Sequence, residues 1–370
     1  MDVGKVMNGR ILRFLLHSLT VTFDYLELSV SPNTVLSIYL DVDISDKANV
    51  KKTITYYFNR AFYKIDMVLN KSDYRLKTMR FINFIRNNVK KTTKIHSDTD
   101  YIKACNSFDL LLFGSDQIWN PNWYHKYYFA NFEEVKTRRI SYAPSFGVSE
   151  MNKGMEAFYA DALASFQEIT VREGDGAEIV EELIGRRPEV VVDPTFLLNC
   201  NEWAKIEARP HRLPEKYILC YFLSDNWKHW RAARRFSKKY GLPLVVLPNT
   251  GSSCIRTRHF MRDAGPSEFI YLIRNADYVI TDSFHGAVFS VIFEKKFAIF
   301  ERHKQTSRRS QNSRLLNLKI ILNNQLNIIP YGSAIINENW IDYELIRATL
   351  EKKINGSKEK LKDMIGEENG

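Results

Sequence analysis

Two series of short apolar strands, each alternating with helical segments, predict an α/β protein whose parallel sheets are covered by helices on both faces. The chain has 370 residues, a length that fits two domains of ordinary size better than one. A polar segment that contains Pro210 and Pro214, residues 199–215, separates the two series. We therefore expect two Rossmann-like domains, residues 1–198 and residues 199–370, with a cleft between them.

In residues 1–60 strands and helices do not alternate regularly. A basic helical segment, residues 74–95, comes next, and the first series begins after it. Its strands are expected at residues 109–113, 139–142, 168–171 and 190–192, and its helix at residues 174–183. The second series has expected strands at residues 217–222, 243–247, 278–281 and 296–300, and expected helices at residues 227–239, 267–274 and 338–364. Each expected strand is a short apolar run bounded by polar or turn-forming residues, as buried parallel strands are.

The chain is basic, with 53 lysines and arginines against 43 aspartates and glutamates, a net charge of +10 and a sequence pI near 9.2. Such a balance indicates an anionic partner. The basic residues recur in separate segments, residues 80–94, 228–239 and 302–314, instead of in one tail. We therefore expect a phosphorylated substrate, together with peripheral contact to an anionic membrane, and no nucleic acid.

The spacing of cysteines and histidines argues against several classes of site. The four cysteines lie far apart, no Cys-x-x-Cys occurs, and no histidine pair has the spacing of metal ligands. We therefore expect no metal and no disulfide framework. A Gly-x-Gly-x-x-Gly fingerprint, a Walker loop and a Gly-x-Ser-x-Gly elbow are also absent from the sequence, which argues against a dehydrogenase, an ATPase and an α/β-hydrolase.

The expected location is the cytoplasm, with peripheral contact at the inner membrane face. Widely spaced cysteines suit a reducing compartment. No stretch has the ~20 apolar residues that a membrane-spanning helix requires. Arg10 and Arg13 interrupt the apolar run near the N-terminus, which makes it a poor signal peptide.

Residues 277–290 form the most informative segment for function. Residues 277–281 predict a strand and the apolar residues 287–293 predict a buried helix, so His285 lies where the strand ends and the helix begins. Ligands of parallel sheets bind at this corner, where the first helical turn presents backbone N–H groups to an anion. A histidine there can also exchange a proton near neutral pH. The alternative is that His285 only caps the helix, but its Asp-Ser-Phe-His-Gly setting favours function.

A second polar segment begins at Gly114, where an apolar strand ends. Asp116, Gln117, Trp119 and Asn120 supply a carboxylate, two amides and a flat ring. Sugar recognition uses hydrogen bonds to hydroxyl groups and stacking on a ring face, so these residues are candidate ligands of a sugar. The spacing agrees equally well with the alternative, in which this segment is a capped turn and Trp119 lies in the core.

Two arginines are candidate anion ligands. Arg172 follows a strand and precedes a helix, where a guanidinium could bind a phosphate or carboxylate through two N–H groups. The alternative is that Arg172 only pairs with neighbouring carboxylates at the surface. Arg314 stands directly before an apolar helix start and is the candidate among residues 302–314. Asp193, at the end of another strand, is more simply explained as a turn cap.

Six segments, taken together, resemble the polysaccharide pyruvyl transferase family. They occur in the family's order and lie within roughly residues 75–325, and such an ordered set is more specific than any single motif. The segments are residues 114–121 (Gly-Ser-Asp-Gln-Ile-Trp-Asn-Pro), 140–147 (Ile-Ser-Tyr-Ala-Pro-Ser-Phe-Gly), 171–173 (Val-Arg-Glu), 192–195 (Val-Asp-Pro-Thr), 265–269 (Gly-Pro-Ser-Glu-Phe) and 280–286 (Ile-Thr-Asp-Ser-Phe-His-Gly). Residues 1–60 lack the strand, glycine-bearing loop and helix with which members of the family open.

The resemblance implies a GT-B-like fold and the transfer of pyruvate from phosphoenolpyruvate onto sugar hydroxyls, usually as a ketal, in surface polysaccharide, exopolysaccharide or capsule. It implies that His285 is the active-site histidine and that Arg172 binds phosphoenolpyruvate. Many members have an arginine two residues before the histidine; that position is Ser283 here, and Arg314 is the candidate replacement.

The resemblance also implies the partners of the two domains. Phosphoenolpyruvate, the donor substrate, would bind mainly to the second domain, and no further cofactor is required. A sugar or lipid-linked oligosaccharide acceptor would bind to the first domain. Two other functions stay open: a GT-B-type glycosyltransferase that uses a nucleotide sugar, and a catalytically inactive carbohydrate-binding relative. Protection against thermal unfolding by a nucleotide would indicate the glycosyltransferase. Sugar binding without turnover would indicate the inactive relative.

Overall fold

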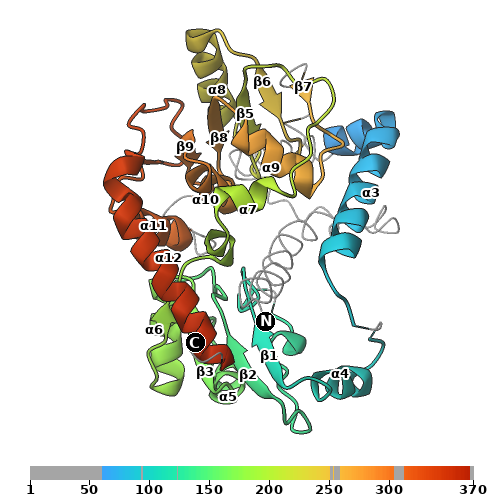
Figure 1. Cartoon of the computed structure of the whole chain (residues 1–370), viewed down its shortest axis with the longest axis vertical. Coiled ribbons are helices and arrows are strands. Elements are labelled where there is room, and N and C mark those ends of the chain that lie inside the picture. The colour runs from blue at the N-terminus through green and yellow to red at the C-terminus, as the bar shows by residue number, and fades with distance from the viewer. Residues whose placement is uncertain are drawn as a thin grey trace, which may run out of the picture.

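The computed structural model describes residues 61–92, 95–122, 124–250, 253, 259–303 and 312–366. Two parallel sheets form its framework, and helices cover them (Figure 1). The expected α/β class with two parallel sheets is therefore confirmed. The irregular region expected at residues 1–60 lies outside the described residues, as does much of the basic segment at residues 302–314.

The first sheet has four parallel strands in the order β1-β2-β3-β4. They are β1 (Leu110–Phe113), β2 (Arg138–Ser141), β3 (Glu168–Val171) and β4 (Glu189–Val190). The first three agree with the expected strands to within one residue. The fourth ends two residues early, because the Val192 N–H turns away from the sheet and donates to Oγ of Ser357. Three helices accompany this sheet: α4 (Asp98–Cys105), α5 (Glu156–Ala164) and α6 (Gly174–Ile184).

The second sheet has six parallel strands in the order β10-β9-β8-β5-β6-β7. Four of them were expected: β5 (Ile218–Tyr221), β6 (Leu244–Val246), β8 (Tyr278–Thr281) and β9 (Lys296–Phe300). The other two, β7 (His259–Phe260) and β10 (Ile328–Ile329), are too short to give a periodic signal in the sequence.

The helices expected at residues 227–239 and 267–274 agree with the structure to within one residue, whereas the last helix begins five residues later than expected. The expected linker, residues 199–215, contains a short helix whose Trp203 is buried in the core. Six helices of the described residues belong to this half of the chain. They are α7 (Cys200–Ala204), α8 (Trp227–Tyr240), α9 (Pro266–Arg274), α10 (Phe284–Ile292), α11 (Asn312–Ile321) and α12 (Tyr343–Ile365). Local sequence sets their ends. In α8, for example, the Asn226 side chain accepts a hydrogen bond from the Lys228 N–H, and Gly241 ends the helix in the left-handed conformation at φ 66°.

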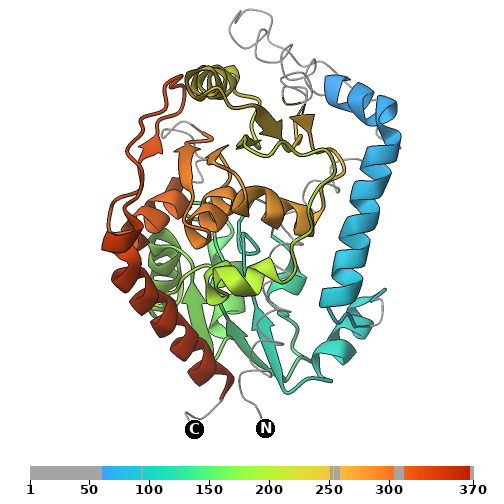
Figure 2. The same ribbon diagram turned by 45° about the horizontal axis from the view of Figure 1, so that its top comes forward.

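Two helices pack beyond their own part of the sequence. The basic helix α3 (Lys71–Asn88) precedes the first sheet, yet it packs against α9 beside the second sheet. Its Arg80 pairs with Asp263 at 2.8 Å and with Glu268 at 3.2 Å. In the other direction α12 returns to the first sheet, where Lys360 pairs with Glu168 at 3.0 Å. The two helices therefore flank the two sheets on opposite sides (Figure 2).

One buried apolar core joins the two halves of the chain. It contains Phe84 of α3, Tyr142 after β2, Phe289 of α10 and Leu361 of α12. Since close-packed side chains resist displacement, this core fixes the first sheet relative to the second. That packing decides where the ends of the strands meet.

Candidate active site

The carboxyl ends of strands from both sheets meet at one buried cluster of charged side chains. In the first sheet Asp116 follows β1, Arg172 follows β3 and Asp193 follows β4. His285 lies in the first turn of α10, directly after β8 of the second sheet. Because ligands of parallel α/β proteins bind at this edge of a sheet, the cluster is the candidate active site.

Arg172 lies at the centre of the cluster and is only 1% exposed. Its Nη1 donates to Oδ2 of Asp193 at 2.7 Å, and its Nη2 donates to Oδ1 of Asp116 at 2.9 Å. Burial alone would lower the pKa of the guanidinium, but the charges of Asp116 and Asp193 raise that pKa above its ordinary value. Arg172 is therefore charged and engaged by two carboxylates, so it joins the ends of β1 and β4.

Asp116 connects the first sheet to the second half of the chain. Besides Arg172, its Oδ1 lies 3.4 Å from Nη1 of Arg314, which α11 supplies. Burial alone would raise the pKa of Asp116, but the charges of Arg172, His285 and Arg314 lower it to about 2. Its backbone is in the left-handed region at φ 55°, which an aspartate tolerates better than most residues. The carboxylate is therefore ionised and shared between two arginines.

His285 faces Asp193 across the boundary between the sheets. Nε2 of His285 lies 3.7 Å from Oδ2 of Asp193, while Oδ1 of Asp193 accepts hydrogen bonds from the N–H and hydroxyl of Thr195 at 3.0 and 2.6 Å. Burial alone would raise the pKa of Asp193, but the neighbouring His285 and the charge of Arg172 hold it well below its ordinary value. An ionised carboxylate beside an imidazole is how proteins orient a histidine that exchanges a proton with a substrate.

Arg314 is a second buried guanidinium beside the start of α10. Burial, followed by repulsion from Arg172, lowers the pKa of Arg314 to about 10, which still leaves it charged at neutral pH. Its Cζ lies 5.4 Å from the centroid of the Phe284 ring, and Cζ of Arg172 lies 4.9 Å from the same centroid. Both cations therefore lie beside the helix start that carries His285.

The first turn of α10 is built tightly against the end of β8. Oγ of Ser283 accepts a hydrogen bond from the Gly286 N–H at 3.3 Å, so Ser283 caps the helix. Oγ1 of Thr281 accepts one from the Ser283 N–H at 3.0 Å. A Cβ at position 286 would lie 2.7 Å from Oγ1 of Thr281, so only glycine fits there without displacement. The glycine after His285 therefore lets the helix begin close to the strand.

A second buried network, which was not expected from the sequence, supports the turn before this helix. Asp282 accepts hydrogen bonds from the backbone N–H groups of Leu223 and Ser224 at 2.6 and 3.1 Å. Nδ1 of His229, a fully buried residue of α8, lies 3.7 Å from Oδ2 of Asp282. Burial alone would raise the pKa of Asp282, but the neighbouring His229 and the charge of Arg302 lower it. Asp282 could have been predicted as part of the site, because it follows a strand end. His229 could not, because nothing in its local sequence distinguishes it from the other residues of a basic helix.

Glu173, one of the carboxylates that the surface alternative pairs with Arg172, is also buried. Its Oε1 accepts hydrogen bonds from the hydroxyl of Ser145 at 2.7 Å and from the N–H groups of Phe146 and Gly147 at 2.9 and 3.3 Å. The surface alternative is therefore wrong, because both Arg172 and Glu173 are enclosed. Glu173 holds the turn after β2 against the start of α6.

The structure contradicts the expected stacking of a sugar on Trp119. This side chain is 0% exposed, and the rings of Phe129 and Phe146 each lie 5.6 Å from its ring. The alternative of a core tryptophan is correct, since packed aromatic rings cover its faces. Gln117 is half-buried and accepts a hydrogen bond from Nδ2 of Asn120 at 2.9 Å, and its role as an acceptor ligand stays a prediction.

The described residues contain neither a metal-binding cluster nor a membrane-spanning helix. In the part of the chain that the structure describes, no cluster of three His, Cys, Asp or Glu side chains is arranged to hold a metal ion. Among the helices of those same residues, none combines the length and the apolarity that crossing a bilayer requires.

Two parallel sheets whose strand ends share a histidine–carboxylate cluster define an α/β enzyme with its candidate site between the sheets. The family model described as polysaccharide pyruvyl transferase matches residues 11–304. The chain belongs to the polysaccharide pyruvyl transferase family, which makes it a transferase of polysaccharide biosynthesis. The match confirms the resemblance and also covers residues 11–60, where the sequence analysis found no family pattern.

Several solved structures are similar to this one at low sequence identity. The UDP-GlcNAc 2-epimerase of Methanocaldococcus jannaschii is 10% identical, with 74% of this chain and 80% of that chain covered and a TM-score of 0.41. A protein described as a UDP-N-acetylglucosamine 2-epimerase from Listeria monocytogenes is 12% identical, with 78% and 87% covered and a TM-score of 0.46. The UDP-GlcNAc 2-epimerase of Neisseria meningitidis is 13% identical, with 72% and 84% covered and a TM-score of 0.37. No curated protein gives a significant match to the sequence.

Proposed function

We propose that this chain transfers pyruvate from phosphoenolpyruvate onto two hydroxyls of a sugar as a ketal, during the synthesis of a surface polysaccharide. The observation that carries the proposal is the His285–Asp193 pair, 3.7 Å apart, at the strand ends of both sheets. A paired histidine beside two buried arginines supplies a proton donor and positive charge in one place. Membership of the family supports the pyruvyl group as the one transferred.

The reaction defines what the site has to do. A proton added to the methylene carbon of phosphoenolpyruvate leaves a cationic C2, which the first sugar hydroxyl attacks. The second hydroxyl then attacks C2 as the C2–O bond to phosphate breaks, so the products are the ketal and inorganic phosphate. Each hydroxyl gives up its proton to a base or to the departing phosphate. His285 is assigned as the donor of the first proton or as a ligand of the leaving phosphate.

The two arginines receive different roles in this proposal. Because Asp116 and Asp193 engage both terminal nitrogens of Arg172, we assign Arg172 to holding these carboxylates in place. Nη1 of Arg314 lies 3.4 Å from Asp116, and its guanidinium lies beside Phe284, next to the position where many relatives have an arginine. We therefore assign Arg314, together with the capped first turn of α10, to the carboxylate or phosphate of the donor.

The acceptor is proposed to approach from the first sheet. Asp116 and Gln117 stand at the end of β1, opposite α10 of the second half of the chain. A sugar or a lipid-linked oligosaccharide placed there would meet the donor at the boundary between the sheets. The proposal requires no metal or further cofactor, since the arginines and the helix start provide the charge that the anionic donor needs.

The test is to incubate the full-length protein with phosphoenolpyruvate and a panel of sugar and lipid-linked acceptors. We expect release of inorganic phosphate that depends on the acceptor, and a product whose mass has increased by one ketal-linked pyruvyl group. Calorimetry with phosphoenolpyruvate alone should give saturable binding. Thermal protection by nucleotide sugars but not by phosphoenolpyruvate would instead indicate a glycosyltransferase, and sugar binding with no turnover would indicate an inactive relative.

A further inference from the structure

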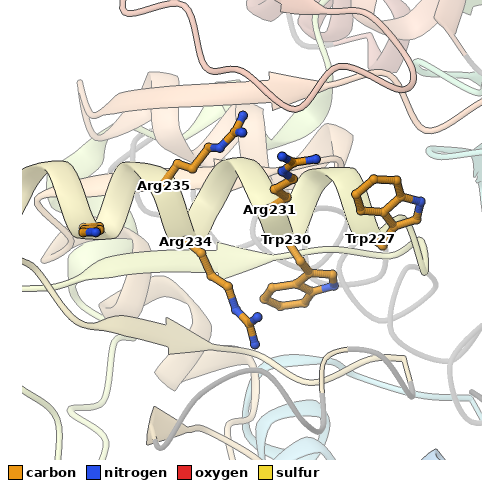
Figure 3. A pocket seen from close by; sticks show the side chains of 6 residues that line it. Trp227, Trp230, Arg231, Arg234 and Arg235 are labelled. Atoms are coloured by element: carbon orange, nitrogen blue, oxygen red, sulfur yellow. The ribbon is translucent and has the colours of Figure 1, made fainter.

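Helix α8 presents an exposed strip of basic side chains with a tryptophan at one end. Trp227, Arg231, Arg234 and Lys238 recur at helical spacing on one face, and Arg235 lies beside them. They line a surface pocket of about 400 Å³, and Figure 3 shows Trp227 and the three arginines projecting from successive turns. We call these five residues the α8 strip.

The other face of α8 is already used by the fold. Trp230, Ala233 and Phe236 are buried in the core against the second sheet. Trp227 is different, since 56% of it is exposed. Because the apolar face of α8 already packs on the sheet, the exposed Trp227 does not contribute to that core. Helix α8 itself lies at the outer edge of the molecule (Figure 1).

A neighbouring loop adds apolar side chains to the same surface. Nη1 of Arg235 donates to the carbonyl of Ala334 at 3.5 Å, and the next residue, Ile335, is 64% exposed. The ammonium group of Lys228 lies against Gly332, which follows the exposed Tyr331. Large apolar groups from two elements therefore stand beside the cations.

Among the described residues, no neighbouring carboxylate neutralises the positive charge of the strip. In the part of the chain that the structure describes, no carboxylate lies within ion-pair distance of the three arginines of the strip or of Lys238. The nearby Glu338 is engaged elsewhere, by Lys239 and by the hydroxyl of Tyr240 at 2.7 Å. The surface is thus complementary to a dense layer of negative charge.

We propose that the α8 strip docks this protein on the anionic phospholipid headgroups of a membrane. Cations near such a surface each strengthen binding roughly five-fold, and aromatic and aliphatic side chains insert at the boundary between headgroups and acyl chains. The strip and its neighbouring loop combine these two features: four cations with Trp227, Tyr331 and Ile335. A free polyanion would require the cations but would give no role to the exposed Ile335.

This docking would bring the candidate site close to the membrane. Trp227 begins α8 at the carboxyl end of β5, and the preceding Asn226 lies 3.0 Å from Nε2 of His229. His229 in turn contacts Asp282, which directly precedes the cap of α10. The tryptophan end of the strip and the His285 turn therefore belong to the same edge of the second sheet. The inference concerns binding alone and does not depend on the proposed reaction.

The test is co-sedimentation of the full-length protein with vesicles of phosphatidylcholine, with or without phosphatidylglycerol, at about 0.15 M salt. We expect binding only to the vesicles that contain phosphatidylglycerol. Charge reversal of the strip, Arg231→Glu with Arg234→Glu and Arg235→Glu, should weaken the partition constant roughly 100-fold or more. Trp227→Ala should weaken it several-fold at low and high salt alike.

A matched control reverses three exposed lysines elsewhere, Lys90→Glu, Lys91→Glu and Lys352→Glu, with the same change in net charge. This control should keep most of the binding, because the proposal depends on the strip and not on total charge. Equal loss in both triple variants, or wild-type binding by the strip variant, would overturn the proposal. So would tight binding of a single-stranded oligonucleotide through the strip together with no binding to the vesicles.

Discussion

His285 and Asp193 come from different sheets, and Nε2 of the histidine lies 3.7 Å from Oδ2 of the aspartate. The histidine stands at the start of α10 after β8, and the aspartate follows β4. Their contact therefore requires that the two sheets are packed as they are here. The side chains of the shared core and of α12 hold this packing and so support the candidate site.

We expect His285→Ala to reduce the rate of pyruvyl transfer by ~10²–10⁴, since that is the usual contribution of a positioned proton donor. Phosphate release in the presence of acceptor measures it, and circular dichroism checks the fold. The control is His211→Ala, because His211 is exposed in the connection between the sheets and should leave the rate unchanged. Wild-type turnover in His285→Ala would remove the histidine from the mechanism.

We expect Arg172→Met to lower the free energy of unfolding by ~3–5 kcal/mol, because it leaves the buried carboxylates of Asp116 and Asp193 without their shared cation. Urea denaturation at neutral pH measures this change. Arg187→Met is the control: the side chain of Arg187 is 54% exposed in its pair with Glu181, so its loss should cost no more than about 1 kcal/mol. Equal effects of the two substitutions would show that the Arg172 network contributes no special stability.

The stability of the protein should fall in acid partly because of Asp116, whose pKa is lowered from 3.8 to about 2. Since the folded-state pKa is the lower one, the stabilisation is complete above about pH 4 and is lost as the pH falls toward 2. The difference corresponds to about 2 kcal/mol. In Asp116→Asn the urea midpoint should therefore fall less steeply between pH 5 and pH 3. Asp175 is the opposite control, because burial raises its pKa. In Asp175→Asn the urea midpoint should therefore fall more steeply with decreasing pH than in the wild type.

We expect Gly286→Ala to displace the first turn of α10, because the new Cβ would lie 2.7 Å from Oγ1 of Thr281. Overpacking of this kind costs about 1–3 kcal/mol, and it should also reduce turnover by moving His285. Gly356→Ala is the control, since nothing lies within 4 Å of a Cβ at that position of α12. Alanine there should stabilise the protein by about 0.5–1 kcal/mol. A Gly286→Ala variant with unchanged melting temperature and turnover would contradict the steric argument.

Much of the fold could be predicted because periodicity and turn residues act locally. The strands β3, β8 and β9 and the helix α9 follow directly from apolar runs and their boundaries. The sequence also placed His285 at a strand end before a helix, which needs only the local pattern. The strands β7 and β10 were not predicted, because a strand of two residues is too short to show a periodic pattern. Their pairing also depends on neighbours that are distant in the chain.

Only the tertiary structure decided which polar residues meet and which are buried. Trp119 and Arg172 both follow strand ends, yet one is enclosed by aromatic rings and the other by carboxylates. The partner of His229 is Asp282, far away in the sequence, and α3 packs against α9 of the second half although it precedes the first sheet. The sequence by itself determined the α/β class, the strand ends and the family, because these depend on local order. The charged cluster depends on the close packing of two sheets, and no local pattern encodes that packing.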